Sequence, residues 1–322
     1  MHKIVIAGSA FLWAAVGVAD EECAASAARS AEFSTDGIVR LEVRAGAGDL
    51  TVQGESGLRS VQATGTACAR SEAQLERIQI RLERDGDTLV LEANPPQMGV
   101  NPRDWFGGTP RLDLEVRVPA NLAVDIEDSS GNARIANLAS AQVSDESGDL
   151  EIENIRGALR VSDGSGNVTI RNINGPVRIN DGSGDFTITK VVGDVIVTDD
   201  GSGSMEIFDV QGNVTIGSDG SGDIQIDLVR GSVRIEEDGS GEIRISGVQH
   251  DVTIDDDGSG DITATNVQGD LTVGVAGSGG VHHENVRGRV RVESEGIDTG
   301  ASEEQQPEIA SEELEVENSG DE

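Results

Sequence analysis

The chain has few of the features that enzymes and nucleic-acid-binding proteins commonly share. Of its 322 residues only 2% are aromatic, none is tyrosine, and 24 basic residues stand against 59 acidic ones. The resulting net charge of −35 repels nucleic acids and anionic lipid surfaces, which makes both poor partners. Few aromatic side chains argue against the large core of a typical globular enzyme, whereas 36% apolar residues argue against wholesale disorder.

Long apolar runs are also missing, since no stretch reaches the roughly 20 residues that cross a bilayer. We therefore expect no transmembrane segment. Residues 1–19 have the pattern of a signal peptide, with Lys3 as the basic flank, an apolar run from Ile4 to Val18, and small residues before the cleavage site. The mature, exported protein would begin near Asp20.

Cysteine is nearly absent, with Cys23 and Cys68 as the only two. An even count in an exported chain favours one disulfide in an oxidising compartment, which would tether the mature N-terminus. Two free thiols are the alternative. A zinc site is disfavoured because no histidine lies near either cysteine in the sequence.

Residues 297–322 carry ten acidic residues and no basic one. Such a segment cannot collapse on itself, because its charges repel one another. We predict a disordered acidic tail that improves solubility.

An internal repeat dominates the middle of the chain. Gly-Ser-Gly triplets recur with second glycines from Gly166 to Gly279, at a spacing of 18 and then 19 residues. Degenerate copies begin at Gly131 and Gly148 and bring the number of units to nine. In each unit the apolar residues alternate in two short runs, which is typical of two strands. We assign the bend between them to glycines such as Gly231.

One unit cannot bury its own apolar face, but stacked units can bury theirs continuously. Residues 126–296 therefore predict an all-β fold, a parallel β-solenoid of about nine coils of 18–19 residues. Parallel crossovers favour a right-handed coil. At a strand spacing of about 4.8 Å, nine coils give a rod roughly 43 Å long.

Residues 20–125 predict a β-rich N-terminal cap with one short helix. The pattern Ser71-x-x-Gln74 is typical of a helix start, and we place this helix from Ser71 to about Arg77. Asp85-Gly86 divides two alternating runs as a hairpin turn would, and a further strand ends at Pro119. Such a cap would cover the open edge of the first coil.

Together these features resemble the “putative adhesin” family of bacterial exported β-strand-repeat proteins. The signal peptide, the early cysteine pair and the reiterated strings GSGD-I-x-I and V-x-G-x-V-x-I carry the likeness. The resemblance implies a non-enzymatic structural or binding module in the bacterial periplasm or on the cell surface. It brings no catalytic or binding residues with it, and the acidic tail is not part of its pattern.

An aspartate precedes nearly every Gly-Ser-Gly triplet. These residues are Asp163, Asp181, Asp200, Asp219, Asp238 and Asp257. Stacked at about 4.8 Å, their carboxylates would repel one another, and a bound cation such as Ca²⁺ would relieve the repulsion. Alternatively, each aspartate accepts backbone hydrogen bonds in an Asx turn, which is the interpretation that we favour. No other cofactor is expected.

Catalysis finds little support in this pattern. Paired catalytic carboxylates need contrasting environments, whereas we expect the aspartates to occupy equivalent, exposed turns. We predict no catalytic residue, and a carbohydrate-active solenoid or a self-assembling envelope scaffold remain the alternatives. Trp105 and Phe106, in the loop from Asn94 to Pro110, are candidates for contact with a glycan or an envelope protein, or they plug the solenoid end. We expect a monomer.

Overall fold

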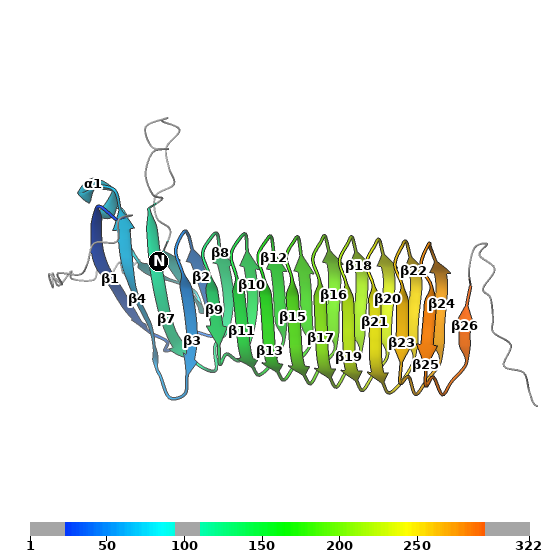
Figure 1. Ribbon diagram of the computed structural model, residues 1–322. Coiled ribbons are helices and arrows are strands. Elements are labelled where there is room, and N and C mark those ends of the chain that lie inside the picture. Colours follow the sequence, from blue (N-terminus) through cyan, green and yellow to red (C-terminus); the bar gives the residue numbers. More distant parts are fainter. Residues whose placement is uncertain (1–22, 94–109, 294–322) are drawn as a thin grey trace, which may run out of the picture.

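The computed structural model describes residues 23–93 and 110–293, and all of its regular structure is β except for one short helix. Two 13-stranded sheets face each other along a rod (Figure 1). The predicted signal peptide, the loop with Trp105 and Phe106, and the acidic tail lie outside the described residues.

The strands alternate between the two sheets along most of the chain. Sheet A contains, in spatial order, β1 (Ala25–Ser34), β4 (Ser60–Ala69), β7 (Arg111–Pro119), β3 (Leu50–Glu55), β9 (Ala133–Ala136), β11 (Leu150–Ile155), β13 (Val168–Ile173), β15 (Phe186–Val191), β17 (Met205–Val210), β19 (Ile224–Val229), β21 (Ile243–Val248), β23 (Ile262–Thr265) and β25 (Val281–Glu284). Sheet B contains β5 (Arg81–Asp85), β6 (Thr88–Ala93), β2 (Arg40–Ala45), β8 (Ala123–Asp128), β10 (Ser140–Asp145), β12 (Leu159–Asp163), β14 (Val177–Asp181), β16 (Val195–Asp200), β18 (Val214–Asp219), β20 (Val233–Asp238), β22 (Val252–Asp257), β24 (Leu271–Ala276) and β26 (Val290–Val292).

Each coil of the repeat gives one strand to each sheet, and successive coils pair in parallel and in register. Inward side chains such as Ile226 and Ile235 are fully buried between the sheets. Burial of these stacked Val, Ile and Leu columns is the main source of stability, because each coil covers its neighbours. The predicted β-solenoid of about nine coils is confirmed.

The bend near the end of each repeat strand in sheet A differs from our expectation. The residue with a positive φ precedes the third inward position, and it is usually asparagine, as in Asn172 (φ 58°), although Leu228 also takes it (φ 60°). Gly231 is required for another reason: a Cβ atom there would collide with the backbone of Gly212 in the preceding coil. Close stacking, rather than backbone conformation, selects this glycine.

The N-terminal region closes one end of the rod. β2 and β3 already behave as a coil, since they pair in parallel with β8 and β9, so coiling begins within the range that we assigned to the cap. β1 and β4 then extend sheet A with antiparallel pairing, and the β5–β6 hairpin ends sheet B. The helix α1 (Glu72–Leu75) starts at Ser71, whose side chain accepts a hydrogen bond from the Gln74 amide. The predicted helix, hairpin and strand are confirmed.

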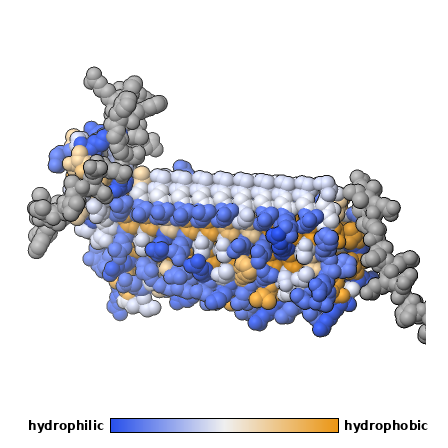
Figure 2. Space-filling view, viewed as in Figure 1, coloured by the Kyte–Doolittle hydropathy of each residue, from blue (hydrophilic) through white to orange (hydrophobic). Residues whose placement is uncertain are grey.

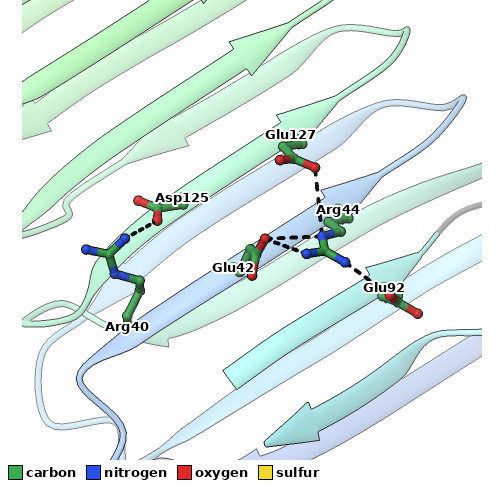
Figure 3. A network of polar contacts seen from close by, with 6 residues as sticks. All are labelled: Arg40, Glu42, Arg44, Glu92, Asp125 and Glu127. Carbon is green, nitrogen blue, oxygen red and sulfur yellow. Dashed lines mark hydrogen bonds and ion pairs between the residues drawn. The ribbon is translucent and has the colours of Figure 1, made fainter. Parts of the chain in front are cut away.

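Covalent and ionic contacts hold this cap together. Cys23 and Cys68 form the expected disulfide, with 5.4 Å between their Cα atoms. On the outer face of sheet B, Arg44 lies between Glu42, Glu92 and Glu127, and so connects β2, β6 and β8 (Figure 3). These charged groups are solvent-exposed, so each pair adds little stability. No helix in the described ranges is long and apolar enough to cross a membrane.

Candidate functional site

Aspartates form a continuous column along the inside of the rod. Each is the last residue of its sheet B strand up to β22, and each pairs in register with the next. The column consists of Asp128, Asp145, Asp163, Asp181, Asp200, Asp219, Asp238 and Asp257. It stops where Ala276 takes the position. Sequence reasoning missed Asp128 and Asp145, although each precedes a degenerate triplet.

Burial of this column contradicts our expectation of exposed turns. All eight side chains are between 1% and 4% exposed. Up to β14 the cause is strand phase: in β12 the inward positions are Leu159, Val161 and then Asp163, so the aspartate continues the buried set. From β16 onward one extra outward residue precedes the aspartate, as in Val197, Thr198, Asp199 and Asp200, and the aspartate still returns to the interior. The Gly-Ser-Gly turns stack outside the column, and their small side chains form a pale band along one long edge of the rod (Figure 2).

These carboxylates have few hydrogen-bond partners. Only Asp128 receives a normal hydrogen bond among the described residues, from the Ser129 amide at 3.0 Å. At Asp181 desolvation raises the pKa, and the amide groups of Gly182 and Ser183, which face the carboxylate outside normal hydrogen-bond geometry, offset part of that rise. The Gly182 amide instead donates to the Asp163 carbonyl at 3.0 Å, within the coil stack.

Desolvation raises the pKa of every aspartate in the column, and for most members a neighbouring carboxylate raises it further. The pKa is raised to about 7 for Asp219, Asp238 and Asp257, and to about 6 for Asp200. Two adjacent carboxyl groups can form a hydrogen bond only if one is protonated. The column is therefore suited to hold and share protons near neutral pH.

Calcium fits this column poorly. Ca²⁺ takes six to eight oxygen ligands, but a linear stack offers carboxylates only from the coil above and the coil below. Within residues 23–93 and 110–293, no three His, Cys, Asp or Glu side chains cluster in a way that could hold a metal ion. The geometry favours protons over Ca²⁺ as the charges that neutralise the column.

Most other turn aspartates have a structural role on the surface. Just after the triplets, Asp149 accepts a hydrogen bond from the Asn167 amide at 3.1 Å, and Asp223 accepts one from the Glu242 amide at 3.0 Å. At the opposite turn, Asp194 accepts from the Asn213 amide at 2.8 Å. Each side chain thus satisfies a backbone N–H in the next coil, which gives these aspartates a structural reason.

A polar groove crosses the outer face of sheet A near the cap. It comprises two adjoining hollows of about 760 and 530 Å³, which share Asp49 and Thr51. The first lies beside α1, where Arg29 donates to the carbonyls of Leu75 and Ile78, both at 2.7 Å. This pair of hydrogen bonds fixes one wall of the groove.

The second hollow lies over four successive coils and has a charged floor. Glu151 forms ion pairs with Arg134 at 2.6 Å and with Arg171 at 3.3 Å, and these pairs order all three side chains. Thr51 and Thr169 flank Arg134 and Glu151 in the same row of outward positions. Sequence reasoning missed this groove, because its residues come together only when the coils stack.

The solved structures to which this chain is similar include three from bacteria. A “putative adhesin” from Parabacteroides distasonis is 12% identical, with a TM-score of 0.42, and the match covers 80% of this chain and 97% of that one. A “putative adhesin” from Bacteroides fragilis is 13% identical (TM-score 0.35; 80% and 97% covered). A “putative lipid binding protein” from Parabacteroides distasonis is 15% identical (TM-score 0.38; 82% and 96% covered).

Among curated proteins no sequence matches the chain. Its family is defined instead by a match over residues 69–248, which spans the second half of the cap range, both degenerate copies and five of the Gly-Ser-Gly triplets. The chain belongs to the family described as “Putative auto-transporter adhesin, head GIN domain”.

Proposed function

We propose that the protein is an exported, non-enzymatic, adhesin-like module of the bacterial cell envelope or surface. The observation that carries the proposal is the polar groove over Thr51, Arg134 and Glu151, built on strands of a stacked solenoid. Strands hold side chains more rigidly than loops do, so the groove is preorganised for contact. Membership of an adhesin-like family and a disulfide in the cap support the same role outside the cytoplasm.

A neutral glycan is the partner that the groove suits best. Its floor presents threonine hydroxyls, asparagine amides and ion-paired arginine and glutamate side chains, all of which hydrogen-bond to sugar hydroxyls. A net charge of −35 repels strongly anionic polysaccharides at long range. Each contact would be weak, and several modules on one surface would add avidity.

An enzymatic role for the aspartate column is disfavoured by its burial. At 1–4% exposure, these carboxylates are out of reach of a polysaccharide chain. The column instead acts inside the scaffold, where its charge state affects the stability of the rod. Stiffening by Ca²⁺ remains the alternative for the column, although the ligand geometry does not favour it.

The test is binding of the full exported chain to an array of bacterial polysaccharides. The groove variant Arg134→Ala with Thr169→Ala should reduce binding of a neutral glycan by about tenfold, the effect of losing one or two good contacts. Its matched control, Arg178→Ala with Thr215→Ala, removes the same side chains from outward positions of sheet B and should bind normally.

If both variants bind equally, the groove is not the binding site. If no form of the protein binds, a neutral glycan is not the partner. Incubation with each bound polysaccharide, followed by an assay for new reducing ends, distinguishes an adhesin from a carbohydrate-active enzyme. Mass spectrometry of the exported protein tests the predicted N-terminus near Asp20.

A further inference from the structure

The end of the rod opposite the cap is open in the described part of the chain. β25 and β26 are the last described strands of sheets A and B, so among residues 23–93 and 110–293 one side of each has no pairing partner for its backbone N–H and C=O groups (Figure 1). Inward positions there also lose their cover: Val290 is 39% exposed, whereas Leu271, its partner in the preceding coil, is fully buried. Edges of this kind invite pairing with another strand.

The last coil is also unusually basic for so acidic a chain. His282, His283, Arg287, Arg289 and Arg291 lie within ten residues of one another in the sequence. Arg289 pairs with Asp270 at 2.8 Å but stays 85% exposed. Arg287 and Arg291 make no ion pair with any residue that the structure describes. This end therefore combines an unpaired edge, exposed apolar positions and a positive charge cluster.

The sequence contains a further copy of the sheet A strand beyond residue 293. Residues 149–154 read Asp-Leu-Glu-Ile-Glu-Asn, and they form β11 with inward Leu150 and Ile152 and a bend at Asn154 (φ 58°). Residues 313–318 read Glu-Leu-Glu-Val-Glu-Asn. All six positions match in chemical type, including the asparagine that the left-handed bend favours.

We infer that residues 313–318 dock on β25 as an additional parallel strand of sheet A and close the open end of the solenoid. In register, Leu314 lies beside Val281, Val316 beside His283, and Asn318 beside Asn285, which has the same bend conformation (φ 56°) as Asn266 in the coil before. Leu314 and Val316 then cover the inward column that β25 leaves open. For these six residues, the proposal replaces our expectation of a disordered tail.

Charge and chain length both agree with this register. Asp321 and Glu322 follow the docked segment and fall beside the turn that carries Arg287 and Arg289. Residues 294–312, nineteen in number, are available to return from the end of β26 to the start of sheet A. The four residues 277–280 suffice for the same connection between β24 and β25, so the longer linker imposes no strain.

Hydrogen exchange of the β25 amides in the full chain tests the docking. We expect these amides to be protected, and the double variant Leu314→Glu with Val316→Glu to raise their exchange rates by at least about tenfold. The matched control, Ile297→Glu with Ile309→Glu, places the same charges in the tail but outside the repeat match, and it should leave β25 unchanged. Amides of β17 report that the rod is folded in all three proteins.

Fast exchange at β25 in the unmodified chain would overturn the proposal, and so would equal effects of the two double variants. A second copy of the chain is the rival occupant. In that case β25 protection would rise with protein concentration and light scattering would show a dimer or filament, which would refute docking within one chain. Neither result bears on glycan binding at the groove, so the two proposals fail independently.

Discussion

Replacement of one buried aspartate by asparagine should stabilise the protein at pH 8, and by about half as much at pH 5. Asp200 is the test case, because it lies inside the column at 1% exposure and its pKa is raised from 3.8 to about 6. Desolvation is the largest cause of this rise, followed by repulsion from Asp181. Asparagine has nearly the same shape and carries no charge at either pH.

The sign follows from proton linkage. The folded state binds a proton at Asp200 more tightly than the unfolded state does, so stabilisation is complete below about pH 4 and is lost as the pH rises through about 6. A shift of about two pKa units corresponds to at most about 3 kcal/mol of unfolding free energy. Because neighbouring carboxyl groups share protons, we expect about 1–3 kcal/mol at pH 8, or roughly 2–10 °C in melting temperature.

Thermal and urea unfolding of both proteins at pH 5 and pH 8 measures this difference. The matched control is Asp199→Asn, which removes the same charge from the adjacent, exposed position. It should change the unfolding free energy by less than about 0.5 kcal/mol at either pH. Equal stabilisation by both variants would assign the effect to net charge. Destabilisation by Asp200→Asn at pH 8 would refute the reasoning, because the ionised carboxylate would then be a required hydrogen-bond acceptor.

Three further predictions concern the bend, the disulfide and calcium. Leu228 has a left-handed backbone (φ 60°) and is 63% exposed. Leu228→Asn should therefore raise the unfolding free energy by about 1 kcal/mol, measured by urea titration. A loss of stability would mean that the leucine makes a contact worth more than its backbone strain. Joint replacement of Cys23 and Cys68 by serine opens a loop with a sequence separation of 45. It should lower the unfolding free energy of the cap by up to about 4 kcal/mol, seen as melting at a lower temperature. An unchanged melting curve would show that the cap does not need the bond. Millimolar Ca²⁺ should leave the melting temperature of the full chain within about 1 °C of its value in EDTA. A calcium-specific rise that is lost in Asp219→Asn would instead support Ca²⁺ binding by the column.

The sequence alone determined the architecture, because the repeat spacing and the period of two act locally and identically in every coil. Apolar residues that recur at the same positions, such as Ile226 and Ile245, can be buried together only by stacking in register. The disulfide followed from a count of two cysteines, and the short helix followed from Ser71 and Gln74. None of these inferences needed distances between remote residues.

Only the tertiary structure decided which side of the strand the aspartates occupy. Asp163 continues the inward phase of Leu159 and Val161, but the adjacent Gly-Ser-Gly triplet had suggested an exposed turn. Whether such a side chain faces water or the core depends on where the chain turns relative to its neighbours, and stacking sets that point. The groove over Arg134, Glu151 and Arg171 likewise exists only across coils, since Glu151 lies 17 positions from Arg134 and 20 from Arg171 and meets both through the parallel stacking.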